Sequence, residues 1–211
     1  MQPGRLHRFL YRVVRSPGPR HWCIRVLGAL LVLFACTTHA GDSPPREYLD
    51  EETGATVTLD TEALVFAYQR RELAANARDY VSLQAAAVNR SGKVSYVLIS
   101  YVWSTVDPRV RQEPLLNPDQ LLLQADDRRI PFNARGHSAH DAGIGMVVDA
   151  PSGSSGLPTV YPTDLATLRF IAESRHLTVA VDTETSTLLY DLWDDRRADL
   201  VRFVRHMSGA D

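Results

Sequence analysis

The sequence predicts an α+β domain with a mostly antiparallel sheet or small β-sandwich and two late amphipathic helices, preceded by a signal peptide. Three observations lead to this fold class. Apolar and polar residues alternate with period two over most of the chain from Tyr48 onward, and two long β-prone runs flank an Asn-Arg-Ser-Gly turn. Helical periodicity is confined to the C-terminal part. The pattern therefore gives about eight strands and two helices, with the helices late in the chain.

The start of the chain has the features of an export signal in the order that such a signal needs. Arginines without any acidic residue come first, and the apolar run from Val26 to Ala35 follows. This run is about ten residues long, roughly half of the ~20 that a helix needs to cross a bilayer. The arginines of the basic region are Arg5, Arg8, Arg12, Arg15, Arg20 and Arg25. We therefore interpret residues 1–35 as a signal peptide for the general secretion route.

Two cleavage sites compete at the end of this signal. The tetrapeptide Leu33-Phe34-Ala35-Cys36 resembles the lipobox of bacterial lipoproteins, which implies that Cys36 becomes the first mature residue and carries acyl chains such as palmitate. Phe34 departs from the smaller residue that this pattern prefers. Small residues before Gly41 fit ordinary signal peptidase, which releases a soluble periplasmic or secreted protein. An uncleaved membrane anchor is a third alternative.

The lipobox resemblance also implies a location. Thr37 stands where lipoproteins retained in the inner membrane of Gram-negative bacteria carry Asp, so we expect the outer membrane, facing the periplasm. The membrane is then a partner through the lipid on Cys36. Cys23 and Cys36 are the only cysteines, so the exported domain has no disulfide and depends on its hydrophobic core for stability.

Residues 36–47 read as a flexible spacer, because Pro44 and Pro45 disfavour both helices and central strands. Residues 48–208 form a single exported α+β domain. Its first expected strands are Thr56 to Leu59 and Leu64 to Tyr68. The strongest pairing signal is a hairpin in which Tyr80–Val88 and Lys93–Trp103 flank the turn Asn89 to Gly92.

The middle of the domain mixes loops with a second hairpin. Three prolines mark 107–118 as a loop or edge segment, and Asp126-Asp127 separates the strands 121–125 and 128–132. Pro131 places the second of these strands at an edge of the sheet. Residues 133–158 are rich in Gly, Ser and His, so we expect a long, mobile excursion.

The C-terminal part is predicted to contain a helix, a strand pair and a closing helix. The first helix spans 164–174 with Thr163 as its N-cap, strands follow at 177–181 and 187–193, and the last helix spans 195–207. The expected core residues are Val57, Leu59, Val65, Phe66, Val97, Ile99, Leu168, Ile171, Val179, Leu189, Phe203 and Val204.

Charge restricts the class of partner. Without residues 1–40 the chain keeps 17 Lys and Arg against 25 Asp and Glu, a net charge of about −8. Nucleic acids and anionic lipid surfaces both need clustered cations, so an acidic domain is a poor match for either, and we expect no nucleic acid partner. The sequence identifies no cofactor.

Several short segments of the exported part carry a resemblance to a known family. They are Tyr48-Leu49-Asp50, Thr53 to Thr58, Ala77 to Val81, Val88-Asn89-Arg90 with Gly92, and Trp103 to Asp107. With these segments the chain resembles uncharacterised envelope lipoproteins of Gram-negative bacteria with high-GC genomes. The resemblance implies a similar envelope location, and it transfers no catalytic residue because that family has no established activity.

The candidate metal ligands are His137, His140 and Asp141, whose side chains suit zinc or another divalent ion. Glycines on both sides argue against a helix there, and a solvated loop is the competing interpretation. The run Ser152 to Gly156 lacks the spacing of a nucleophile turn, so we interpret it as a linker.

Two acidic pairs and one aromatic group remain. Asp126-Asp127 and Asp194-Asp195 are candidate paired carboxylates, although a turn and a helix start account for them equally well. Tyr96, Tyr101 and Trp103 are candidates for an aromatic strand face that meets a partner, or for core residues.

The function that we expect from the sequence is noncatalytic: a lipid-anchored envelope domain that binds a protein or another envelope component. One alternative is a periplasmic metal-dependent hydrolase that uses His137, His140 and Asp141. A soluble periplasmic ligand-binding protein is the second alternative.

Overall fold

The computed structural model describes residues 43–109, 118–145, 150–151, 154, 157–183 and 186–209. The signal peptide and Cys36 lie outside these residues. The described elements are β1 (Arg46–Asp50), β2 (Ala55–Leu59), β3 (Leu64–Gln69), β4 (Arg78–Arg90), β5 (Lys93–Ser104), β6 (Gln120–Ala125), β7 (Arg128–Asn133), α2 (Ala139–Ala142), β8 (Thr159–Thr163), α3 (Leu165–Glu173), β9 (Leu177–Asp182), β10 (Thr187–Asp194) and α4 (Arg197–Met207). The predicted α+β class with a mostly antiparallel sheet and late helices is confirmed.

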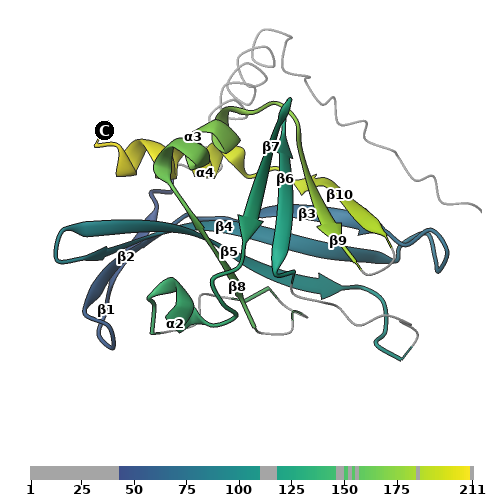
Figure 1. The fold of residues 1–211 in the computed structure, drawn as a ribbon, viewed down its shortest axis with the longest axis horizontal. Helices are drawn as coiled ribbons and strands as arrows, with labels where there is room; N and C mark the ends of the chain where they lie inside the picture. The colour runs from purple at the N-terminus through teal and green to yellow at the C-terminus, as the bar shows by residue number, and fades with distance from the viewer. Residues whose placement is uncertain are drawn as a thin grey trace, which may run out of the picture. The chain divides into compact units, whose positions relative to one another are not determined.

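The ten strands form one antiparallel sheet that curves into a half-barrel (Figure 1). β4 organises it, because this long strand pairs with β2 and β3 along one edge and with β5 along the other. β5 continues to β8, while β3 continues through β10, β9 and β6 to β7. An isolated bridge between Gly136 and Val160 links the chain after β7 to β8.

Both predicted hairpins are confirmed. β4 and β5 pair over their whole length, from Asp79 opposite Ser104 to Arg90 opposite Lys93. Ser91 and Gly92 form the turn with φ of 52° and 85°, the left-handed region that two-residue hairpin turns require. β6 and β7 form the second hairpin, and β7 ends the strand order, as Pro131 predicts.

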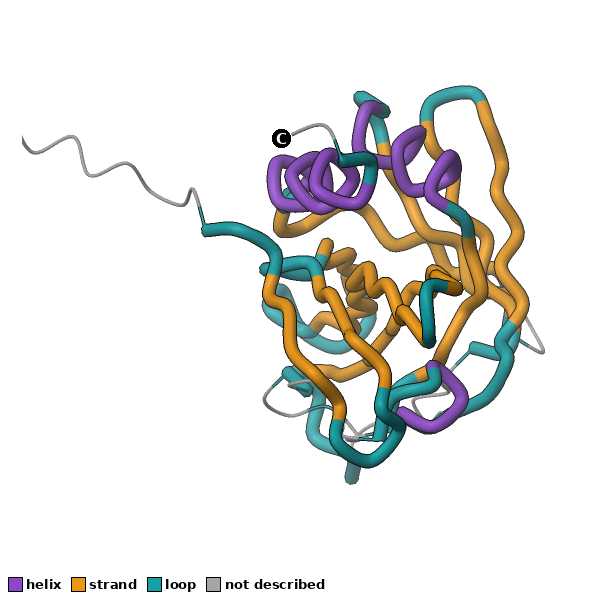
Figure 2. The backbone as a smooth tube through the Cα atoms, turned by 90° about the vertical axis from the view of Figure 1, so that its left-hand side faces the viewer, coloured by secondary structure: helices purple, strands orange, loops and turns teal. Residues whose placement is uncertain are grey.

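The main core fills the inside of the half-barrel. Phe66 and Tyr161 are fully buried there with inward residues of the other strands. α3 and α4 cover one end, and α2 lies at the opposite end (Figures 1 and 2). Leu168 of α3 and Phe203 of α4 bury their side chains in this core, because apolar residues recur on one face of each helix.

A second, smaller core lies on the outer face of the sheet. Val57 and Leu59 of β2 and Val97 and Ile99 of β5 contribute to it, together with residues from the segment between β7 and β8. Ile144 from that segment is fully buried. The expectation of a loosely attached excursion over 133–158 is therefore wrong for its described first part, because that part supplies core residues.

Two strands were not expected. β1 carries few apolar residues and, among the described strands, pairs on one side only, with β2. β8 contains Pro162, which disfavours a central strand. β8 is a strand because it pairs with β5. Pro162 is tolerated there because β8 is the last strand on the side of the sheet that begins with β5.

Three local expectations are corrected. Leu189 is 60% exposed and Val65 is half-buried, because both lie on the outer face of the sheet rather than in a core. The N-cap of α3 is Asp164, not Thr163, since the Asp164 carboxylate accepts a hydrogen bond from the Thr167 amide at 2.8 Å. Among the described residues, no helix is long and apolar enough to cross a membrane.

Candidate functional site

An aromatic group lies on the outer face of the sheet, beyond the second core. Tyr80 of β4 and Trp103 of β5 are directly opposite each other, and their rings stack with centroids 5.2 Å apart and planes 10° apart. Trp193 of β10 meets Tyr80 edge-on at 6.2 Å. Period two places these side chains on the same face of neighbouring strands. Aromatic pairs in such geometry stabilise one another beyond the area they bury.

Trp193 is fixed although more than half of it is exposed. The pairing of β10 with β3 shifts register between Leu192 and Asp194, so Trp193 lies at an irregularity of the strand. Its exposed fraction is 58%, and the Arg78 guanidinium lies over its ring at 4.7 Å. Cation–π contact and the edge of Tyr80 hold the indole in one position.

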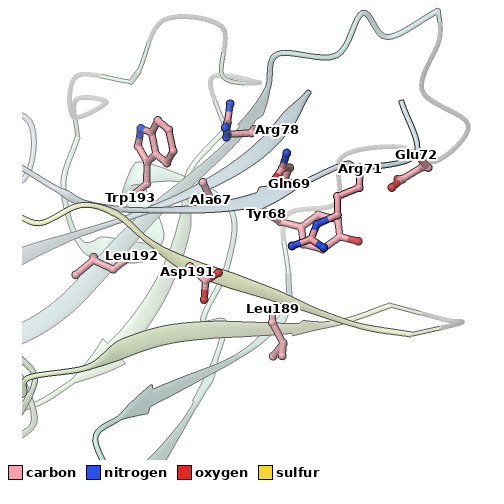
Figure 3. Close-up of a pocket in the computed structure, with 10 residues that line it drawn as sticks. All are labelled: Ala67, Tyr68, Gln69, Arg71, Glu72, Arg78, Leu189, Asp191, Leu192 and Trp193. Atoms are coloured by element: carbon pink, nitrogen blue, oxygen red, sulfur yellow. The ribbon is translucent and has the colours of Figure 1, made fainter. Parts of the chain in front are cut away.

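A hollow of about 500 Å³ lies beside Trp193, where side chains of β3, β4 and β10 gather (Figure 3). We call it the Trp193 hollow. Its lining residues are Ala67, Tyr68, Gln69, Arg71, Glu72, Arg78, Leu189, Asp191, Leu192 and Trp193. The lining thus combines two arginines and two carboxylates with apolar side chains, among them the exposed Leu189. In binding sites of this mixed kind, polar groups fix the orientation of a ligand and apolar side chains contribute binding energy.

A second hollow of about 550 Å³ lies on the other side of the aromatic group and includes Trp103. Asp60, between β2 and β3, lines it, yet only 2% of this residue is exposed and its Oδ1 has no hydrogen-bond partner among the described residues. Burial raises the pKa of Asp60 to about 8, and the nearby Asp199 carboxylate adds to this rise. Asp60 is a buried group of altered acidity, and in the described part of the chain no group of three or more His, Cys, Asp and Glu side chains around it is arranged to hold a metal ion.

The predicted metal ligands have separate partners. His137 contacts Asp119 through Nε2 at 2.8 Å and Thr159 through Nδ1 at 3.1 Å. His140 Nε2 lies 3.9 Å from Glu52. Asp141 accepts hydrogen bonds from the backbone and hydroxyl of the same serine in a capping box at the start of α2.

This capping role explains the acidity of Asp141. Hydrogen bonds from Ser138 hold its pKa below the usual range. In the described residues, no group of three or more His, Cys, Asp and Glu side chains is arranged to hold a metal ion.

The acidic pairs have local roles in the structure. Asp126 lies in the β6–β7 turn and accepts the backbone amides of Arg175 and His176, which lowers its pKa. Asp194 pairs with Arg196, and Asp195 with Arg197, at the start of α4. Within the serine-rich run 152–156, the structure describes Ser154, which forms an isolated β-bridge with Trp103.

The three aromatic residues singled out in the sequence do not share one face. Tyr96 packs against the main core, whereas Tyr101 belongs to the second core. Trp103 has the same strand parity as Tyr101 and lies beyond it, where it meets Tyr80. Sequence reasoning missed Tyr80 and Trp193 as members of this group. The period-two pattern of β4 and β10 indicates on which face of each strand Tyr80 and Trp193 lie. Only the strand order of the folded sheet shows that the two residues are close together.

No protein-family model, no curated protein and no solved structure matches this chain.

Proposed function

We propose that this protein is a noncatalytic binding domain, held at the bacterial cell envelope by a lipid on Cys36, that binds a protein partner on the outer face of its sheet. The binding surface consists of Tyr80, Trp103 and Trp193 with Arg78 and Leu189, and we call it the Trp193 surface. The observation that carries this proposal is the exposed Trp193, fixed between Arg78 and Tyr80.

The energetics of protein interfaces support a partner at this position. Trp, Tyr and Arg dominate the binding energy of protein interfaces, usually as a few central residues surrounded by polar ones. Here the rings are already stacked, so little side-chain entropy is lost on binding. Charges of both signs surround the Trp193 hollow, which suits a protein rather than the uniformly negative surface of a nucleic acid.

The partner is tested with a photo-crosslinking amino acid placed at Leu189 in living cells. The matched control position is Leu49 of β1, since the two leucines have exposed fractions of 60% and 64%. We expect one discrete adduct from position 189, none from position 49, and loss of the adduct when Trp193→Ala is added. The crosslinked protein is then purified, and Trp193→Ala should weaken its binding at least about tenfold, the effect typical of a central interface residue. Equal adducts from both positions, or adducts that persist without Trp193, contradict the proposal.

The anchor is tested separately with Cys36→Ser. We expect the wild-type protein to incorporate labelled palmitate, to fractionate with the outer membrane and to begin at an acylated Cys36. The variant should lose the label and leave the membrane, because acyl chains contribute about 0.8 kcal/mol per buried CH₂. The folded domain should be unchanged, since no other cysteine follows residue 36. An unmodified mature chain that starts at Gly41 contradicts the lipid anchor.

A further inference from the structure

Cationic side chains converge on a small hollow at the end of the β4–β5 hairpin, away from the Trp193 surface. The hollow has a volume of about 260 Å³. We call it the cationic hollow. Its lining residues are Val88, Arg90, Lys93, Ser95, Arg135, His140, Asp141, Ala142 and Gly143. Lys93 is the only lysine of the chain, and the two arginines come from segments 45 residues apart in sequence.

Among the residues that the structure describes, no ion pair neutralises the cations of this hollow. Within the described part of the chain, no carboxylate forms a salt bridge with Arg90, Lys93 or Arg135, although the exported part has an excess of acidic residues. Asp141 is the one carboxylate among the described lining residues, and Ser138 already occupies it with two hydrogen bonds. The hollow therefore keeps an excess of positive charge.

The fold fixes the backbone of the three residues that carry these cations. Arg90 and Lys93 are opposite each other at the closing pair of the hairpin, and Arg90 Nη2 donates to the Gly143 carbonyl at 3.1 Å. The Arg135 amide donates to the Val160 carbonyl at 2.8 Å, which ties this residue to β8. Gly143 has φ of 81° and lies directly before Ile144, which the second core buries. Paired strands thus fix the backbone at all three cations, and the Gly143 carbonyl also holds the Arg90 guanidinium.

We infer that the cationic hollow binds a phosphate group, carried by a small molecule or by a lipid headgroup. The planar guanidinium of arginine matches two phosphate oxygens at once, and lysine adds a point charge. The volume suits one such group, since a pocket for a whole drug-sized molecule is typically ~300 Å³ or more. A nucleic acid needs a row of cations along its backbone, and a single hollow does not provide that. His140 and Asp141, candidates for metal ligands in the sequence, line this phosphate site instead.

The experiment uses the full-length chain with Cys36→Ser, so that no acyl anchor contributes, and inorganic phosphate as the probe. Amide resonances of Lys93, Arg135 and Gly143 should shift on phosphate addition but not on addition of chloride at equal ionic strength. Lys93→Gln and Arg135→Gln should each weaken phosphate binding about tenfold, because each removes one charge-assisted contact. Arg129→Gln is the matched control, since Arg129 is an exposed arginine on β7 outside the hollow. It should leave the affinity unchanged.

Vesicles distinguish the two sources of the phosphate. If phosphatidylglycerol in phosphatidylcholine vesicles recruits the protein, and Lys93→Gln abolishes this recruitment, the ligand is a lipid headgroup. If only inorganic phosphate binds, the ligand is a small molecule. The inference is overturned if phosphate has no more effect than chloride, or if Lys93→Gln and Arg135→Gln bind phosphate as the wild type does while their spectra remain those of a folded protein.

Discussion

Arg70 donates a hydrogen bond from Nε to Oδ2 of Asp79 at 2.7 Å, and the Asp79 side chain is only 1% exposed. The Arg70 guanidinium also lies over the Tyr68 ring at 5.6 Å. The ion pair joins the loop after β3, which carries Arg70, to the start of β4, which carries Asp79. The Asp79 carboxylate is therefore a buried charge whose main described partner is Arg70.

Removing Arg70 should destabilise the domain strongly. Arg70→Ala leaves the buried Asp79 carboxylate uncompensated, a change that typically costs about 3–5 kcal/mol. Urea denaturation measures this free energy of unfolding. Glu72→Gln is the control, because Glu72 is exposed and lies 3.7 Å from Arg70, and surface pairs contribute about 0–1 kcal/mol. A loss for Arg70→Ala no larger than that for the control refutes the role of the pair.

The raised pKa of Asp60 predicts a specific pH dependence. A carboxyl with a pKa of about 8 in the folded state, against an ordinary value of 3.8, holds its proton better when folded. Its contribution to stability is complete below pH ~4 and is lost as the pH rises to about 8. Asp60→Asn should flatten this decline and make the domain more stable than wild type above pH 8.

Chemical denaturation of both proteins across this pH range tests the assignment. Each unit of pKa difference corresponds to about 1.4 kcal/mol, so the effect should be easily measured. Asp127→Asn, in the exposed β6–β7 turn, serves as the control and should leave the pH profile unchanged. Identical profiles for wild type and Asp60→Asn contradict the raised pKa.

Truncating two apolar side chains, Phe203 and Leu189, should change stability by very different amounts. Phe203 of α4 is fully buried, so Phe203→Ala should cost about 3–5 kcal/mol through lost burial and the cavity left behind. Leu189→Ala should change stability by less than about 0.5 kcal/mol, because Leu189 is exposed on the Trp193 surface. Thermal unfolding of both variants provides the comparison. A cost under about 1 kcal/mol for Phe203→Ala shows that α4 does not pack as described.

Ile144 should anchor the segment between β7 and β8. Its side chain is fully buried in the second core, so Ile144→Ala should cost about 2–5 kcal/mol. Limited proteolysis should then cut residues 133–158 sooner than in the wild type, while the β4–β5 hairpin stays intact, because local opening requires less free energy than global unfolding. Unchanged cleavage in 133–158 indicates that Ile144 does not hold this segment.

Much of the local structure could be predicted from the sequence. Period two and the Asn-Arg-Ser-Gly turn determine the β4–β5 hairpin, and helical periodicity determines α3 and α4. β1 and β8 could not be predicted, because neighbouring strands rather than their own composition make them strands. Leu189 and Phe203 carry equally apolar side chains, and only their positions in the sheet and helix layers decide which one is exposed.

The sequence by itself determined the absence of cysteines after residue 36, the strand-rich class and most element boundaries, because these depend on neighbouring residues. The export signal stays a prediction of the sequence. The tertiary structure decided which residues meet. Trp193 reaches Tyr80 only because β3 connects β10 to β4, and Arg135 joins Arg90 only because the chain after β7 pairs with β8. Both candidate binding surfaces arise from contacts between residues distant in sequence, and these contacts follow from strand order and core packing rather than from local pattern.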